Sequence, residues 1–358
     1  CAVSGPHKGG PFFVRLRGSA MRPYNHFQEL PGEEGRPVNL KRIAVLTSGG
    51  DAPGMNAAIR AVTRTAIYRR VEVVGVVKGF EGLMDGNFQE LNPASVGGIL
   101  HRGGTILRTA RSERFKTPEG LGDAVARMEE HHIDGVVIIG GDGSFRGALT
   151  LAAKGVPVIG VPGTIDNDIA GTDETIGFDT AINTALEAVM KLRDTASSHD
   201  RLFIVEVMGR DSGFLALEVA VAGGAEYVVV PELRFDIGKL CDRLHYSRRR
   251  GKTHSLIILA EGAMSAVELR DRLRDTGGYD ARITVLGYLQ RGGSPTARDA
   301  ILASRMGSFA VESMLAGESG SMVGCVNNTM DLHPLERAWK ERKLLNPELL
   351  DLVEKLSI

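Results

Sequence analysis

Short runs of aliphatic and β-branched residues recur along this chain, and segments with helical periodicity lie between most of them. Strands that are apolar throughout are typical of parallel sheets covered by helices on both faces. We therefore expect an α/β fold of two doubly wound parallel-sheet domains. The expected strands are 43–46, 71–77, 135–139, 156–161, 202–207, 227–230, 256–259 and 283–286, and the expected helices include 179–195, 213–222, 265–275 and 296–315.

The length of 358 residues also favours two domains. Residues 1–40 are rich in Gly, Pro and Arg and lack periodicity, so they predict a disordered extension or linker. The net charge of -1 argues against a dedicated nucleic-acid or membrane-surface binder. No apolar run is long enough to span a membrane. The three cysteines are scattered, which gives neither a disulfide framework nor a zinc site and favours a reducing, cytoplasmic compartment.

Three glycine-rich loops follow expected strands, at residues 48–54, 140–144 and 162–168. Such loops at helix N-termini present backbone N–H groups and the positive end of the helix dipole, an arrangement that suits phosphate. Each loop alone could simply connect a strand to a helix. Their spacing matches neither the P-loop, which needs Gly-Lys-Ser/Thr, nor the dinucleotide fingerprint. Three of them together, each with an aspartate near a glycine, predict a phosphate site of another kind.

The aspartates of these loops could supply metal and acid–base chemistry. Asp142 beside glycines could hold Mg²⁺ near phosphate oxygens. Asp166 and Asp168 could divide the roles of general base and metal ligand, although an Asx turn would also explain them.

Arg111 follows the Gly103-Gly104-Thr105 segment, and Arg210 and Arg291 each follow an expected strand. An arginine at the carboxyl end of a buried strand points toward the ligand crevice of an α/β sheet, where its guanidinium can bind phosphate through two nitrogens. Glu261 also ends a strand, and it could accept hydrogen bonds from substrate hydroxyls or merely begin a turn.

Five segments together closely resemble the bacterial-type ATP-dependent 6-phosphofructokinase family. They are TSGGDAPGMN at 47–56, GGDGS at 140–144, PGTIDND at 162–168, VMGR at 207–210 and QRGGSP at 290–295. The resemblance runs from about residue 42 to the C-terminus. It implies transfer of the ATP γ-phosphoryl group to the 1-hydroxyl of fructose 6-phosphate, with Mg²⁺, in a cleft between the two domains. It implies an ATP-binding domain at 41–177 plus 290–340 and a fructose 6-phosphate domain at 178–289 plus 341–358.

The resemblance also assigns roles to residues. Asp166 matches the base, Thr164 a substrate contact, and Arg111 and Arg210 the groups that stabilise the transferring phosphoryl. Asp142 and Asp168 match metal-binding positions. The positions that match the ATP site are Gly50, Phe80, Arg111, Ser112, Gly141, Asp142, Gly143, Ser144 and Gly147. The positions that match the sugar-phosphate site are Thr164, Asp166, Asp168, Arg201, Met208, Gly209, Arg210, Glu261, Arg282, Tyr288 and Arg291.

A homotetramer is implied as well, with Arg201 and Arg282 supplied to each site by a neighbouring subunit. An effector pocket for ADP or phosphoenolpyruvate is matched by Arg60, Arg64, Arg193, Gly224, Glu226, Arg250 and Lys252.

Three positions depart from the family pattern. Tyr288 stands where a histidine usually contacts the sugar phosphate, and tyrosine cannot carry a positive charge. Pro93 and Gly98 replace an arginine and an aspartate of the effector site, which puts allosteric control in question.

Two alternatives stay open. A pyrophosphate-dependent phosphofructokinase typically carries Asp at the position of Gly143 and Lys at that of Gly163. A protein that senses a nucleotide without turnover would need no base such as Asp166.

Overall fold

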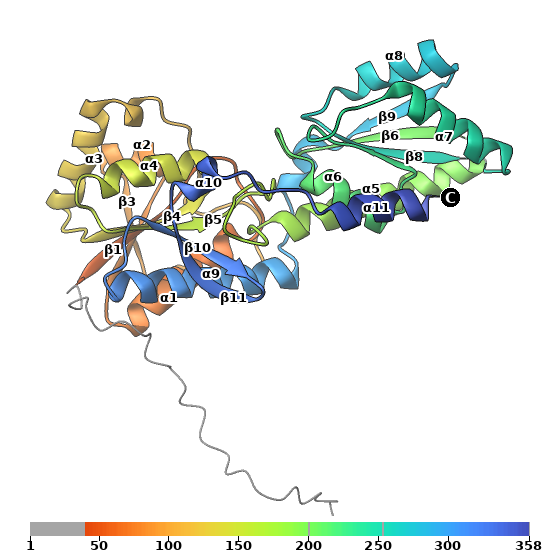
Figure 1. Cartoon of the computed structure of the whole chain (residues 1–358). Coiled ribbons are helices and arrows are strands. Elements are labelled where there is room, and N and C mark those ends of the chain that lie inside the picture. Colours follow the sequence, from red (N-terminus) through yellow and green to blue (C-terminus); the bar gives the residue numbers. More distant parts are fainter. Residues whose placement is uncertain (1–39, 200, 253, 358) are drawn as a thin grey trace, which may run out of the picture. The chain divides into compact units, whose positions relative to one another are not determined.

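A computed structural model describes residues 40–199, 201–252 and 254–357, which belong to one compact unit running from Arg36 to Ile358. Apart from Leu40, the extension expected at residues 1–40 lies outside the described residues. Figure 1 shows two sheets in the described chain, each with helices on both faces. The expected α/β class with parallel sheets is confirmed.

The first sheet has seven strands in the order β11-β10-β5-β4-β1-β2-β3. The five inner strands are parallel, whereas the edge strands β3 and β11 are antiparallel to their neighbours. The strands are β1 (Arg42–Thr47), β2 (Glu72–Val76), β3 (Phe88–Leu91), β4 (Gly135–Gly140), β5 (Val158–Pro162), β10 (Ser321–Val326) and β11 (Thr329–Pro334).

Alternate residues of β1 enter two different hydrophobic clusters, as the period of two in a strand requires. Ile43 and Val45 pack with α1 (Met55–Tyr68) and α9 (Ala297–Leu315) on one face. Ala44 and Leu46 pack on the other face with α2 (Gly79–Asp85), α3 (Pro118–Glu130) and α4 (Asp142–Ala152). A strand buried on both faces must be apolar throughout, which explains the continuous run seen in the sequence.

The second sheet has four parallel strands in the order β7-β8-β6-β9. They are β6 (Leu202–Val207), β7 (Tyr227–Val229), β8 (Ser255–Ala260) and β9 (Ala281–Val285). One face packs with α5 (Phe178–His199) and α6 (Phe214–Gly223), within the same hydrophobic cluster that joins β1 to α1 and α9. The other face packs on α7 (Ile237–Arg249) and α8 (Ala266–Gly277). One continuous core therefore runs from the first sheet to the second.

The remaining elements are short or terminal. They are the 3₁₀ helices η1 (Arg114–Lys116) and η2 (Gly287–Arg291), and the helices α10 (Arg337–Lys340) and α11 (Pro347–Leu356). The site described below is built from loops at the carboxyl ends of the strands, with side chains from α2, η1 and η2.

Three strands were not expected from the sequence: β3, β10 and β11. The two edge strands carry polar residues, Glu90 in β3 and Asp331 in β11, so they lack a continuous apolar run. Gly324 interrupts β10 for a steric reason, since a Cβ there would lie 2.1 Å from the carbonyl oxygen of Gly171. The chain thus completes the first sheet only after it has built the second.

Candidate active site

The loop after β1 lies against an arginine that follows β9 of the second sheet. A Cβ on Gly50 would lie 2.3 Å from Nη1 of Arg291, and that nitrogen donates a hydrogen bond to the carbonyl oxygen of Asp51 at 3.1 Å. Any larger residue at position 50 would therefore push Arg291 away. The glycine is needed so that the two sheets can present their loops to one space.

The loop after β4 opens directly into α4. At Gly140 a Cβ would lie 2.4 Å from Oγ of Ser144 and 2.6 Å from the carbonyl oxygen of Ser48, so glycine lets the β1 and β4 loops pack together. At Gly143, in the first turn of α4, nothing lies within 4 Å of a Cβ. Free N–H groups and the helix dipole at this end favour an anion.

A pocket of about 790 Å³ opens over these loops. All nine residues that the resemblance assigned to ATP line it: Gly50, Phe80, Arg111, Ser112, Gly141, Asp142, Gly143, Ser144 and Gly147. Thr164, Arg210 and Arg291 line it as well. The structure thus brings the three strand-end loops and arginines from both sheets around one cavity.

One wall of this pocket is aromatic. The rings of Phe80 and Phe115 stack with centroids 4.2 Å apart, and a Cβ on Gly147 would lie 2.6 Å from the ring of Phe80. The short distance explains why α4 has a glycine in its middle. An apolar wall in the same pocket as a helix N-terminus can hold a molecule with a flat ring at one end and phosphates at the other.

Asp166 is the most buried carboxylate of the site, with 1% of its surface exposed. Its Oδ2 accepts a hydrogen bond from Oγ1 of Thr164 at 3.1 Å and lies 3.3 Å from Nε of Arg210. Its Oδ1 is buried without a hydrogen-bond partner. Burial raises the pKa of Asp166, while Arg210 and Arg291 act to lower it. A buried carboxylate with one free oxygen and a raised pKa can accept a proton from a bound hydroxyl.

Arg210 links the two aspartate loops, because its Nη1 also lies 3.3 Å from Oδ1 of Asp142. Asp168 completes an acidic group here. Burial raises the pKa of Asp168 to about 6, helped by repulsion from the carboxylates of Asp166 and Asp142. Three carboxylates lie around a single guanidinium here, so negative charge exceeds positive charge and the site can accept a further cation.

No set of three or more His, Cys, Asp or Glu side chains is arranged to hold a metal within the described part of the chain. Mg²⁺ bound with a nucleotide needs only one or two protein carboxylates, since phosphate oxygens and water supply its other ligands. Asp142 and Asp168 are oxygen donors of the required kind, and a cation beside Asp168 would favour its charged form and so lower its pKa. The residues therefore fit Mg²⁺ that arrives with a phosphate chain.

The loop after β6 is held from both sides by long-range hydrogen bonds. Oε1 of Glu261 accepts the N–H groups of Gly209 at 3.2 Å and Arg210 at 2.9 Å, and Oε1 of Gln290 accepts the N–H of Met208 at 2.8 Å. These bonds stabilise a strained turn, with φ of 144° at Gly209 and 51° at Arg210. Glu261, expected to bind a substrate hydroxyl, thus also orients Arg210.

Gln290 and Ser212 were missed in the sequence. Oγ of Ser212 lies 3.2 Å from the carbonyl oxygen of Asp166 and 2.8 Å from that of Gly209, so it joins the Asp166 loop to the Arg210 loop. Gln290 is the first residue of the QRGGSP segment at 290–295, so that motif could have marked it as a site residue. Nothing local marks Ser212.

Other residues assigned to the sugar site do not reach the pocket. Tyr288 in η2 is 83% exposed, and the exposed Arg282 pairs with Asp280 at 3.2 Å. Arg201 lies at the start of β6, the end of that strand opposite to Met208. The structure brings Thr164, Asp166, Arg210 and Arg291 together, but it leaves these three outside.

The expected effector residues form separate pairs. Nη2 of Arg193 donates to the carbonyl oxygen of Gly224 at 3.0 Å, and Nζ of Lys252 lies 2.7 Å from Oε1 of the buried Glu226. Arg250 donates to the hydroxyl of Tyr246 at 3.2 Å. The remaining two, Arg60 and Arg64, lie on α1, which packs on the first sheet.

No helix among the described residues is long and apolar enough to cross a membrane. The fold and the site define a doubly wound α/β protein with a glycine-lined pocket beside a buried carboxylate. Residues 42–314 match the family model described as Phosphofructokinase, and the chain belongs to this family.

Curated relatives agree with this assignment. The chain is 54% identical over 319 residues to the ATP-dependent 6-phosphofructokinase of Listeria welshimeri, covering 89% of this chain and 100% of the relative. It is 53% identical, with the same coverage, to the protein of that name from Oceanobacillus iheyensis.

Solved structures also resemble it. The phosphofructokinase of Pichia pastoris in the T-state matches with a TM-score of 0.80 and 37% identity, over 84% of this chain and 35% of that chain. This chain thus spans about a third of the yeast chain's length. The pyrophosphate-dependent phosphofructokinase of Marinobacter aquaeolei matches with a TM-score of 0.76 at 24% identity, over 88% and 91% of the two chains, which shows a shared fold.

Proposed function

We propose that this protein is a glycolytic kinase that transfers the γ-phosphoryl group of ATP to the 1-hydroxyl of fructose 6-phosphate. The observation that carries the proposal is the buried carboxylate of Asp166, held by Thr164 and Arg210 beside a glycine-lined pocket. The 54% identity to ATP-dependent 6-phosphofructokinases along their whole length supports the same reaction.

In the proposed mechanism, Asp166 accepts the proton of the 1-hydroxyl as the sugar oxygen bonds to the γ-phosphorus. The bond between the γ-phosphorus and the oxygen that bridges it to the β-phosphate breaks, so ADP leaves with that oxygen. Arg210 and Arg111 stabilise the negative charge on the transferring group, and the first turn of α4 binds the phosphate chain. Thr164, through its bond to Oδ2 of Asp166, keeps the other carboxylate oxygen free for the hydroxyl.

Asp142 and Asp168 would hold Mg²⁺. When bound, the cation neutralises charge on the phosphate oxygens. Arg210 lies within 3.3 Å of Asp142 and of Asp166, so the same guanidinium can orient the metal-binding and the proton-accepting carboxylates.

The wider assignments extend this proposal. We propose that residues 41–177 plus 290–340 bind ATP and that residues 178–289 plus 341–358 bind the sugar phosphate, with the reaction in the cleft between them. Homotetramer formation would bring Arg201 and Arg282 of a neighbouring subunit to each sugar site, and both residues lie outside the pocket of their own chain. The residue pairs around Glu226 and Arg193 would belong to a pocket for ADP or phosphoenolpyruvate. We place the enzyme in the cytoplasm, where glycolysis supplies its substrates.

The choice of ATP over pyrophosphate rests on two glycines. The space above Gly143 is open, and Gly163 also lines the pocket, so neither position blocks the room that an α-phosphate needs. A protein that only senses a nucleotide would have no use for the base and the arginines around it.

The test is a coupled assay for fructose 1,6-bisphosphate, run with fructose 6-phosphate and either ATP or pyrophosphate as donor. We expect product when ATP is the donor and none when pyrophosphate is the donor. Product with pyrophosphate alone would contradict the donor assignment, and ATP binding without product would favour the sensor.

A further inference from the structure

Asn167 stands between the two carboxylates Asp166 and Asp168 in an unusual conformation. Its φ of 53° lies in the left-handed region, which costs energy for most residues with a side chain and which asparagine tolerates better than most. Its side chain compensates, since Oδ1 accepts the N–H of Thr175 at 3.1 Å and Nδ2 donates to the carbonyl oxygen of Asp173 at 3.2 Å. This conformation sets the directions in which the flanking carboxylates point.

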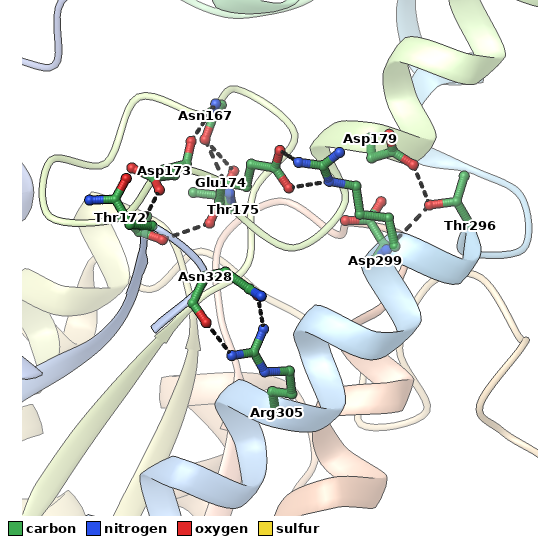
Figure 2. A network of polar contacts seen from close by, with 12 residues as sticks. Asn167, Thr172, Asp173, Glu174, Thr175, Asp179, Thr296, Asp299, Arg305 and Asn328 are labelled. Carbon is green, nitrogen blue, oxygen red and sulfur yellow. Dashed lines mark hydrogen bonds and ion pairs between the residues drawn. The ribbon is translucent and has the colours of Figure 1, made fainter. Parts of the chain in front are cut away.

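The far end of the same loop is fixed to α9, as Figure 2 shows. Arg298 forms two hydrogen bonds to Glu174, and Asp299 accepts the N–H groups of Gly177 and Thr180 at 2.8 Å each. The loop between Asn167 and Thr175 is therefore anchored at its exit, and Thr175 links that exit back to the turn through its hydrogen bond to Oδ1 of Asn167.

Lys343 adds a further support for the Asn167 side chain, from the other end of the chain. It lies between α10 and α11, and its Nζ donates to Oδ1 of Asn167 at 2.9 Å and to the carbonyl oxygen of Asp173 at 2.7 Å. The ammonium also lies 5.2 Å from the centre of the Phe214 ring. Both hydrogen-bond acceptors are uncharged oxygens, one on the Asn167 side chain and one on the backbone of Asp173, to which Nδ2 of Asn167 also donates. The lysine therefore binds the loop itself rather than a neighbouring carboxylate.

Placing an ammonium here is costly. Burial lowers the pKa of Lys343 to about 8, although the carboxylates of Asp173, Glu174, Asp168 and Glu218 act to raise it. A surface lysine such as Lys355, paired with Asp351 on α11, avoids this cost. A half-buried lysine that donates to both Asn167 and Asp173 indicates a role that depends on this loop.

We propose that Lys343 is a positioning residue for phosphoryl transfer, which fixes the carboxylates of Asp166 and Asp168 through the left-handed turn at Asn167. The proposal rests on the proposed function, and it adds a contribution from the C-terminal segment that no sequence pattern assigned. Because Lys343 touches no reacting group, its loss should act mainly on turnover, by misplacing the base.

The first test compares Lys343→Met with Lys343→Arg and the control Lys355→Met. Lys343→Met keeps the apolar stem and removes the donors, so kcat should fall about 10-fold, since small displacements of reacting groups are costly. The KM values for ATP and fructose 6-phosphate should change less than about twofold. Lys343→Arg should recover part of kcat, and Lys355→Met should match the parent. All assays run well below each variant's melting temperature, so that loss of folded protein is not mistaken for loss of turnover.

The second test is a double-mutant cycle with Asn167→Gly, a residue that adopts positive φ without side-chain support. If Lys343 acts through the Asn167 side chain, Lys343→Met should lower kcat much less in the Asn167→Gly background than in the parent. Equal losses in both backgrounds, or an unchanged kcat in Lys343→Met alone, would overturn the proposal. Failure of the proposed function is distinguishable, because the parent protein itself would then form no fructose 1,6-bisphosphate.

Discussion

The proposed nucleotide side and the proposed sugar side of the candidate site are built differently. On the nucleotide side, backbone glycines, one helix N-terminus and two stacked phenylalanines surround a single pocket. On the sugar side, Arg210 and Glu261 are held tightly, whereas Tyr288 and Arg282 are exposed. One chain thus encloses the first half of the site and leaves the second half open.

The difference follows from what each ligand part needs. A phosphate chain can be bound by N–H groups at a helix end, and a local motif supplies these in one stretch of sequence. A sugar phosphate needs several charged side chains that converge from different directions, and a single chain brings few of them to this pocket. We therefore expect the nucleotide half to work within one chain and the sugar half to depend on a second copy.

The largest expected effect is at Asp166, where the two halves meet. Asp166→Asn keeps the shape of the side chain and removes the proton acceptor, so kcat should fall by about 10²–10⁴. The KM for the sugar should change little, because the lost interaction belongs to the transition state. Steady-state kinetics beside the surface control Asp351→Asn provide the measurement, and near-normal turnover in Asp166→Asn would remove the base from the mechanism.

The second-largest effect is expected in the nucleotide half of the site. Gly143→Asp places a carboxylate in the open space at the start of α4, so repulsion of phosphate should lower kcat/KM for ATP at least about 10²-fold. Gly122→Asp is a matched control, because Gly122 is another helical glycine with nothing within 4 Å of a Cβ. If Gly143→Asp used ATP as well as its parent, the pocket would not bind the phosphates at this point.

The sugar half is tested by mixing two inactive variants, Arg201→Ala and Asp166→Asn. If Arg201 reaches the neighbouring subunit's site, a hybrid pair has one site with both lesions and one with neither. Random assembly from equal amounts makes half of the pairs hybrid, so about a quarter of all sites should recover after the two are unfolded and refolded together.

Each variant refolded alone is the control for this experiment. An absence of recovery, with mixed assembly confirmed by mass, would place Arg201 within its own subunit's site or outside the site altogether.

The smallest expected effect is on the free energy of unfolding, through the carboxylate of Asp168. In the absence of Mg²⁺ and nucleotide, folded Asp168 has a pKa of about 6, whereas an aspartate in an unfolded chain has an ordinary pKa of 3.8. Between these two pKa values, unfolding releases the proton that folded Asp168 holds. The free energy of unfolding therefore falls as pH rises from about 4 to 6, and the destabilisation is complete above pH 6.

Asp168→Asn removes that titration and should raise the free energy of unfolding by about 1–3 kcal/mol at pH 7.5, with no gain at pH 4. Urea denaturation at the two pH values measures this, beside the exposed control Asp275→Asn. An equal change at both pH values would mean that the carboxylate is not destabilised by its surroundings.

Sequence reasoning reached the α/β fold because strands buried on both faces are apolar at every position, as Ile43 to Leu46 are. It also singled out the glycine-rich loops, since a phosphate-binding turn is a local motif and its glycines follow one another. The structure gathers Gly50, Asp142 and Asp166 at one place, and their local patterns had marked each of them beforehand.

What the sequence did not predict depends on distant contacts. Gln290 reaches Met208 and Ser212 reaches the carbonyl oxygen of Asp166, in each case through a single hydrogen bond that leaves no periodicity or motif. Lys343 lies in a charged segment near the C-terminus, where its neighbours Glu341 and Arg342 are exposed. Only the folded chain distinguishes such a lysine from an ordinary surface residue.

The late return of β10 to the first sheet has a consequence for synthesis of the protein. β10 pairs with β5 through Ser321 and Met322, so one edge of β5 stays bare until the ribosome has made roughly 160 further residues, on the order of 10–30 s at ~5–20 residues/s. An uncovered apolar edge invites pairing with another nascent chain. A product of translation that stops before residue 321 would lack β10 and β11 and would be prone to aggregate. The seven-stranded sheet begins to form early, but only these late strands complete it.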